Sequence, residues 1–356
     1  MNKGEISMST MKSKSLTAAI CLFLALPMVC SASACAREIV DMTGRNVSVP
    51  DTIKKVYAPS PYGTYIMYAV DPTLLAGLIF PLKEEDTKYL HRRVQGLPVI
   101  GSLFGQGQTA NIEGLLKAKP DLLLMWSDRK SPNSPKAEET LKKLGIPHAY
   151  AAAGSLSDYP DVFLFLGRLL NREVRAKKLS DYSRKILAGV DAAVKRIPEA
   201  KRPKVYYAEG PDGLKTECDD SIHVELLKRA GDTDVHRCHT ASHKGMEHIS
   251  LEQVMLYDPD VILVQEKLFF DKVFTDPAWK RIRAVRQGRV YLIPRTPFNW
   301  FDRPPSFMRI LGLQWLMSRL YPKEYPVDMV KEAQYFYRLF LGVEVSDQEM
   351  RRIIDK

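Results

Sequence analysis

Two stretches of the chain repeat the same order of polar and apolar positions. Residues 111–121 and 250–260 each read as a short helix that ends at a Pro-Asp pair, with a glutamate seven residues before the proline. An unbroken apolar run follows each pair, at Leu122–Met125 and at Val261–Val264. Such a run is typical of a strand that is buried inside a parallel sheet. The repetition predicts two similar α/β lobes in one chain, with a ligand cleft between them.

The flanking segments extend this pattern. Val56–Ala58 and Val205–Ala208 each read as the opening strand of a lobe, and strands alternate with helices after each of them. This alternation predicts an α/β fold with largely parallel sheets. Residues 159–197 place apolar side chains at helical spacing, which predicts one long rigid helix, or two joined end to end, between the lobes. The expected segments are a first lobe at 37–158, the connecting helix at 159–200, and a second lobe with terminal helices at 201–356.

The first 36 residues have the composition of an export signal. Lys12 and Lys14 precede an apolar stretch at Leu16–Val29 that is too short for a comfortable membrane span, and small residues follow at 31–36. These features predict a signal peptide at 1–36 and a location in the periplasm. Cys35 raises the alternative of a lipid anchor, but alanine stands three residues before it, where a leucine-like residue is usual, so a soluble product is favoured.

Composition and charge indicate a globular protein and argue against nucleic-acid binding. The chain has 356 residues, of which 45% are hydrophobic and 26% charged, and this is enough for two domains with separate cores. The net charge of +10 falls to +8 when residues 1–36, which carry three lysines and one glutamate, are removed. No run of five or more basic residues occurs. A nucleic-acid partner is therefore not expected.

Cysteine and histidine residues gather in one part of the predicted second lobe. Cys218 and Cys238 are the two cysteines that remain after removal of the signal, and their positions around a strand and helix predict a disulfide, with free thiols as the alternative. His236, His239 and His243 are candidate ligands for a transition metal. Their spacing matches no standard zinc motif, so a solvated polar rim is the competing interpretation.

Several short motifs occur together in a recognisable order. They include Asp41–Arg45, Asn111–Asp121, Glu225–Leu227, Leu251–Asp260 and Asn299–Arg303. With these motifs the chain, from residue 37 to about residue 340, resembles the periplasmic solute-binding proteins that serve ABC importers of ferric siderophores, cobalamin and haem. The resemblance implies two α/β lobes joined by a long helix. It also implies a metal complex held between the lobes and passed to a membrane permease.

The resemblance gives the glutamate of each repeat a role. In similar proteins this residue lies on the outer face of its lobe and pairs with arginines of the transporter, which makes Glu113 and Glu252 candidates for permease docking. The alternative is that each carboxylate only stabilises the first turn of its own helix.

Candidate ligand-binding residues lie in loops that follow predicted strands, where open α/β sheets bind ligands. Aromatic rings in these loops suit an aromatic or macrocyclic ligand, and two arginines suit an anionic one. Two alternatives stand: Phe298 and Phe301 could belong to the core, and Arg303 could be neutralised by a neighbour such as Asp302. The candidates are Tyr62, Phe104, Gln106, Trp126, Thr216, Arg295, Asn299, Trp300, Phe301 and Arg303.

The leading hypothesis is therefore a monomeric, extracytoplasmic substrate-binding component of an ABC importer that captures an iron-siderophore-type chelate. Cobalamin, haem and molybdate or tungstate are alternative ligands for the same class. A metallochaperone that uses the histidine-rich loop is an alternative of another class. An enzyme is not expected, because the chain has no nucleophile elbow, Cys-x-x-Cys pair or phosphate loop, and no cofactor other than the ligand is implied.

Overall fold

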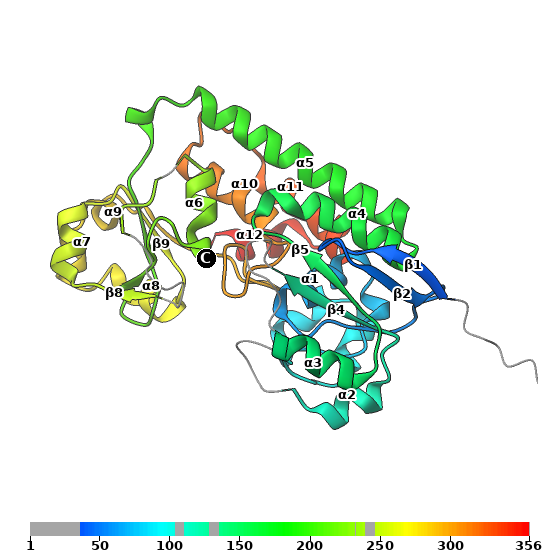
Figure 1. Cartoon of the computed structure of the whole chain (residues 1–356). Coiled ribbons are helices and arrows are strands. Elements are labelled where there is room, and N and C mark those ends of the chain that lie inside the picture. Colours follow the sequence, from blue (N-terminus) through cyan, green and yellow to red (C-terminus); the bar gives the residue numbers. More distant parts are fainter. Residues whose placement is uncertain (1–35, 104–109, 128–134, 232, 239–245, 356) are drawn as a thin grey trace, which may run out of the picture. The chain divides into compact units, whose positions relative to one another are not determined.

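The structure is a computed structural model that describes residues 36–103, 110–127, 135–231, 233–238 and 246–355 (Figure 1). The predicted signal peptide lies outside the described residues, apart from Ala36. Among the described helices, none combines the length and the apolar character that crossing a lipid bilayer requires.

The first lobe is built on a three-stranded parallel sheet in the order β3-β4-β5. An antiparallel hairpin, β1 and β2, precedes it in the chain. The elements are β1 Ala36–Val40, β2 Asn46–Pro50, β3 Val56–Tyr57, α1 Pro61–Val70, α2 Ile112–Ala118, β4 Leu122–Ser127, α3 Pro135–Leu144, β5 His148–Ala152 and α4 Tyr159–Leu170.

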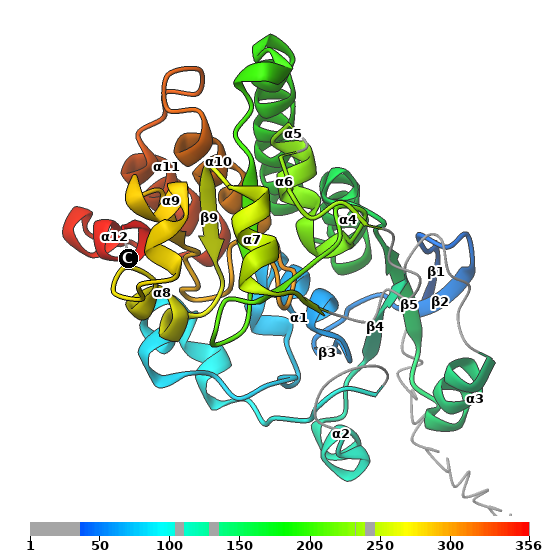
Figure 2. The ribbon, with the colours of Figure 1, turned by 90° about the vertical axis from the view of Figure 1, so that its left-hand side faces the viewer.

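The second lobe has its own three-stranded parallel sheet in the order β10-β9-β6, with a short antiparallel pair, β7 and β8, beside it. Figure 2 shows α7, α8 and α9 around β9. The two-lobe α/β prediction is thus confirmed. The elements are β6 Val205–Ala208, β7 Lys215–Thr216, α6 Glu225–Arg229, β8 Glu247–His248, α7 Leu251–Tyr257, β9 Val261–Val264, α8 Lys267–Val273, α9 Arg283–Arg286, β10 Val290–Leu292 and α10 Arg309–Leu320.

The sequence repeat is also a repeat of hydrogen bonds. The Asp121 carboxylate accepts a hydrogen bond from the backbone N–H of Lys55 at 2.8 Å, and the Asp260 carboxylate accepts one from Lys204 at 2.9 Å. The side chain of Lys55 also donates to the carbonyl of Ala118, the last residue of α2, at 3.1 Å. The side chain of Lys204 donates in the same way to the carbonyl of Tyr257, the last residue of α7, at 3.4 Å. The Pro-Asp pair therefore ties the end of each helix to the opening strand of its lobe.

One helix, α5 (Glu173–Arg196), connects the lobes (Figure 1). The end-to-end arrangement of two helices is wrong, because α4 runs back alongside α5. Asn171 ends α4 in the left-handed region, with φ of 55°. Gly167 then lies directly against Ala176, and the Arg184 guanidinium contacts the Asp161 carboxylate at 2.5 Å. These pairs are possible only for antiparallel neighbours.

The last helices of the chain, α11 (Met329–Phe336) and α12 (Asp347–Ile354), contact the first lobe. The Tyr89 hydroxyl donates to the Glu349 carboxylate at 2.7 Å. Phe340, in the π-helical turn Tyr337–Leu341 after α11, packs on Phe163 of α4 with ring centroids 5.8 Å apart. One continuous apolar core consequently contains residues of both sheets.

Helix α10 crosses the loop that follows β10 at very short range. A Cβ atom on Gly312 would lie 1.7 Å from the carbonyl oxygen of Trp300. Only glycine allows this approach, so this position sets how closely the loop packs beneath α10.

Candidate functional site

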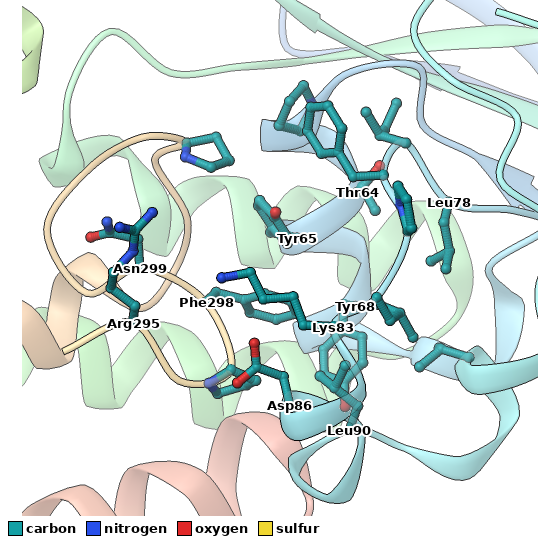
Figure 3. Close-up of a pocket in the computed structure, with 18 of the residues that line it drawn as sticks. Thr64, Tyr65, Tyr68, Leu78, Lys83, Asp86, Leu90, Arg295, Phe298 and Asn299 are labelled. Carbon is teal, nitrogen blue, oxygen red and sulfur yellow. The ribbon is translucent and has the colours of Figure 1, made fainter. Parts of the chain in front are cut away.

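A cavity of about 220 Å³ lies between α1 of the first lobe and the loop after β10 of the second lobe. In Figure 3, Thr64, Tyr65 and Tyr68 come from α1 on one side of this cavity, and Arg295 and Asn299 come from the loop on the other. Segment 75–94, which includes the 3-10 helix Glu84–Tyr89, completes the wall. The side chains that line the cavity include Thr64, Tyr65, Tyr68, Leu78, Lys83, Asp86, Leu90, Arg295, Phe298, Asn299 and Arg303.

Aromatic rings from both lobes meet at this cavity. Phe298 packs on Tyr65 with centroids 4.4 Å apart and on Tyr68 with centroids 5.8 Å apart. Phe298 therefore lines the cavity and also packs against the core, so the ligand-site and core interpretations of this residue are both correct. Sequence reasoning missed Tyr65 and Tyr68, because it considered only loops after strands. Their signal was the spacing of Tyr62, Tyr65 and Tyr68 at intervals of three on a helix that follows a strand.

The cavity carries more positive than negative side chains. Lys83, Arg295 and Arg303 line it together with Asp86. The Arg295 guanidinium donates to the Gln265 carbonyl at 3.1 Å and lies 3.4 Å from the partly exposed Glu266 carboxylate. An exposed pair of this kind is weak, so the charge of Arg295 stays available to a ligand.

Arg303 is held more firmly. Its Nε donates to the Glu209 carboxylate at 2.5 Å, and its Nη2 donates to the Glu217 carboxylate. Asp302 is more distant, at 3.8 Å from the guanidinium, and its carboxylate instead lies 2.5 Å from His223 Nδ1. The prediction of a neutralised arginine thus holds, but the main partners are these two glutamates. We call these five residues the buried charge cluster.

The carboxylates of this cluster are almost completely buried, with Glu209 and Asp302 at 0% exposure and Glu217 at 1%. Burial raises the pKa of Glu209 from 4.5 to about 7, although Arg303 opposes the shift. A carboxyl group whose pKa is raised in the folded state stabilises the fold below its unfolded pKa of 4.5. That contribution is lost as the pH rises through about 7.

Three of the predicted ligand residues are corrected by their burial. Trp300 and Phe301 are fully buried: Trp300 Nε1 donates to the Thr296 carbonyl at 3.0 Å, and Phe301 packs on Tyr207. Thr216 on β7 is also fully buried. None of these side chains lines the cavity, and Trp300 and Phe301 belong to the core because the loop after β10 folds inward beneath α10.

The other predicted ligand residues divide into three groups. Arg295, Asn299 and Arg303 line the cavity. Tyr62 and Trp126 stack on each other at the first lobe, with centroids 5.3 Å apart and planes 17° apart, and neither is among the residues that line the cavity. Phe104 and Gln106 lie outside the described residues.

Asn299 has a positioning role as well. Its side-chain oxygen accepts hydrogen bonds from the backbone N–H groups of Phe301 at 2.8 Å and Asp302 at 3.0 Å. Its amide nitrogen donates to the Gln265 side chain at 3.2 Å. Asn299 therefore fixes the loop that presents the second-lobe wall of the cavity.

Cys218 and Cys238 form a disulfide in the structure. Of the three histidines considered as metal ligands, only His236 is described, since His239 and His243 lie outside the described residues. His236 is buried, and its Nε2 lies 3.1 Å from the Glu247 carboxylate.

Glu113 and Glu252 are exposed in the first turns of α2 and α7, at the same place in the two repeats. Other residues cap these helices: the Asn111 side chain accepts from Gly114 N–H, and the Ser250 hydroxyl accepts from Gln253 N–H. The pKa of Glu252 is lowered by hydrogen bonds from its own N–H and from Ser250, so this carboxylate also serves its own helix.

Comparison with known proteins places the chain in a family. Residues 95–297, more than half of the chain, match the family described as "Periplasmic binding protein". The chain belongs to this family of binding proteins. The solved structure of an ABC transporter solute binding protein from Sulfurospirillum deleyianum shares 38% identity with it at a TM-score of 0.83, over 90% of this chain and 99% of that one.

The names of several curated relatives state a ligand. The molybdate-binding protein MolA of Haemophilus influenzae is 28% identical over 353 residues, which cover 93% of this chain and 97% of MolA. The high-affinity heme uptake system protein IsdE of Staphylococcus aureus is 27% identical over 235 residues, which cover 62% of this chain and 75% of IsdE. The family, MolA and the Sulfurospirillum deleyianum protein are all described as binding proteins, and this periplasmic binding protein is accordingly of the binding class rather than an enzyme.

Proposed function

We propose that this periplasmic binding protein is the substrate-binding component of an ABC importer and carries a compact, anionic metal chelate of the ferric siderophore class. The observation that carries the proposal is the wall of the cavity between the lobes, where aromatic rings adjoin Lys83 and Arg295. Rings offer contact area to the organic part of a chelate at low entropic cost. The two cations attract its negative charge.

The size of the cavity supports a compact ligand. Its volume of about 220 Å³ lies below the ~300–1,000 Å³ that is usual for drug-sized ligands. A tetrapyrrole such as haem or cobalamin is larger than such a cavity, and so is a large siderophore complex, so the proposed ligand is a small ferric chelate. Because α5, α11 and α12 hold the two lobes in one continuous core, wide opening of the cavity is not expected.

Molybdate or tungstate is the second candidate, and one specific observation favours it. MolA, a molybdate-binding protein, matches nearly the full length of this chain. A bare oxyanion has no apolar surface to place against Tyr65, Tyr68 and Phe298, which is why the organic chelate comes first.

Calorimetric titration with a ferric catecholate and with sodium molybdate separates the two candidates. We expect the ferric complex to bind and molybdate to give no heat. Lys83→Ala and Arg295→Ala should each weaken binding about tenfold, because each removes one charge-assisted contact of about 1.4 kcal/mol. Lys280→Ala, an exposed lysine outside the cavity, is the matched control. Binding of molybdate alone would replace the chelate by an oxyanion as the ligand.

Docking to the permease is proposed for Glu113 and Glu252. Their equivalent places in the repeat, their exposure and the presence of separate capping residues support this role. In transport assays with the cognate permease in vesicles, we expect each alanine substitution to lower uptake about tenfold and the double substitution about a hundredfold.

The control for docking is Glu139→Ala, an exposed glutamate of α3 whose partner is Lys143. It should leave uptake unchanged, and none of the substitutions should change ligand affinity. Unimpaired uptake by the double variant would show that both carboxylates serve only their own helices.

Export and assembly complete the proposal. Residues 1–36 direct the chain to the periplasm, where it acts as a soluble monomer. The intact mass of the exported protein measures the cleavage site, and a diacylglycerol adduct on Cys35 would show a lipid anchor instead.

A further inference from the structure

Four metal-ligating side chains converge in the second lobe, and none of them lines the cavity between the lobes. Cys218, His236, Cys238 and Glu247 each bring one ligand atom to within 4.8 Å of the others. The Glu247 carboxylate lies 3.1 Å from His236 Nε2, 3.5 Å from the Cys218 sulfur and 3.8 Å from the Cys238 sulfur. Two sulfurs, one imidazole and one carboxylate make a donor set that suits zinc.

We propose that reduction of the Cys218–Cys238 disulfide converts this group into a binding site for a thiophilic divalent cation of the zinc class. The disulfide and the metal ion are alternative occupants of the same place. While the sulfurs are bonded to each other they carry no thiolate charge, and only the pair of His236 and Glu247 remains. After reduction, the two thiolates complete a four-coordinate site.

The backbone keeps the ligands together without the disulfide. Asp219 N–H donates to the His236 carbonyl at 3.0 Å, and Cys238 N–H donates to the Asp219 carboxylate at 3.1 Å. The ladder of β7 and β8 pairs Thr216 with Glu247. These bonds hold the three segments of the site in register, so the sulfurs need only separate to ~3.8 Å, the spacing of two ligands in a tetrahedral zinc site.

The orientation of His236 also favours a metal ligand. Its Nδ1 lies 2.8 Å from the Tyr257 hydroxyl, and this contact turns Nε2 toward Glu247 and the sulfurs. A hydrogen bond from the second ring nitrogen to an outer partner is the usual support of a metal-bound histidine. Cys218 and His236 are buried, whereas Glu247 is exposed, so a cation reaches the site from the Glu247 side.

Reduction of the disulfide and binding of the cation each conserve electrons and protons. A dithiol reductant gives two electrons and two protons to the disulfide, leaves two thiols and becomes a disulfide itself; a phosphine gives two electrons and becomes a phosphine oxide with an oxygen from water. The cation then binds both sulfurs as thiolates and releases their two protons. A disulfide oxidant that takes two electrons from the two thiolates and two protons from solvent becomes a dithiol, re-forms the Cys218–Cys238 bond and releases the cation.

The test compares the oxidised and reduced protein. After reduction with a phosphine and anaerobic desalting, titration with Co²⁺ should give one bound ion per chain, with sulfur-to-cobalt charge-transfer and tetrahedral d–d absorption bands. Zn²⁺ should displace the cobalt and slow the reoxidation of the thiols. The oxidised protein should bind at least about a hundredfold more weakly. Equal binding by both forms, or a spectrum without thiolate bands, would overturn the proposal.

Variants test which side chains bind the metal. Loss of an outer partner of a metal site costs ~10–100-fold in affinity, so Glu247→Gln, which removes a direct ligand, should cost at least about tenfold. His248→Gln is the matched control, because His248 is the next residue of β8 and lies outside the group. Equal loss in both variants would contradict the site. Since Glu247→Gln keeps both cysteines, its result does not depend on whether cysteine variants fold.

Discussion

Replacement of Arg303 by alanine lowers the free energy of unfolding by about 3–5 kcal/mol at pH 8, because it leaves buried carboxylates without their partner. Glu209 and Glu217 are 0% and 1% exposed, and both accept hydrogen bonds from this guanidinium. Urea denaturation followed by tryptophan fluorescence measures the change. Addition of Glu217→Gln to the variant should restore part of the stability, since it removes one of the unpaired charges.

The loss should depend on pH with a defined sign. Glu209 has a folded pKa of about 7, above its unfolded value of 4.5, so the folded state gains protons as the pH falls. Because the charge of Arg303 lowers this pKa, its removal raises the pKa further. The stability difference between the two proteins should therefore be smaller at pH 5 than at pH 8. A difference that does not change with pH would contradict this account.

Arg295→Ala is the matched control for Arg303→Ala. Arg295 lines the same cavity, but its partner Glu266 is partly exposed. Its removal should cost less than about 1 kcal/mol. If both substitutions lowered the free energy of unfolding by a similar amount, the buried charge cluster would contribute no more to stability than the exposed pair of Arg295 and Glu266.

Replacement of Gly312 by alanine should lower the free energy of unfolding by about 3 kcal/mol, at the upper end of what overpacking costs. The added methyl would stand 1.7 Å from the Trp300 carbonyl oxygen, so α10 or the loop after β10 must move. The same displacement should weaken ligand binding, because this loop carries Arg295, Phe298 and Asn299 into the cavity. Denaturation and calorimetric titration measure the two effects.

Gly189→Ala provides the opposite result in the same kind of element. Gly189 lies in the exposed middle of α5, and nothing stands within 4 Å of its added Cβ. Alanine is a better helix former than glycine, so this variant should gain about 0.5–1 kcal/mol. If Gly312→Ala behaved like Gly189→Ala, the close crossing of α10 and the loop would be disproved.

The parts of the fold that depend on short-range signals could be predicted from the sequence. The Pro-Asp pairs, the apolar runs of β4 and β9 and the opening strands are local patterns, and each appears in the structure where expected. The hairpin of α4 and α5 was missed, because its turn at Asn171 and Arg172 contains neither glycine nor proline. A helix break at an asparagine is a weaker sequence signal.

The site was predicted only in part for a different reason. Arg295, Asn299 and Arg303 were found because they follow a strand, but the same loop carries Trp300 inward against α10. A sequence pattern does not show which side chains of an irregular loop face the interior. Tyr65 and Tyr68 were missed because helix α1, rather than a loop, forms that wall of the cavity.

The contact of the last helices, α11 and α12, with the first lobe also affects the order in which the protein folds. The Glu349 carboxylate accepts hydrogen bonds from Lys88 and Tyr89, which lie about 260 positions earlier in the chain. Such long-range closure is slow, because the entropy of a very large loop is lost before the contact forms. When the chain emerges from a membrane with its amino end first, the first lobe therefore cannot complete its packing until the carboxyl-terminal helix α12 has also emerged.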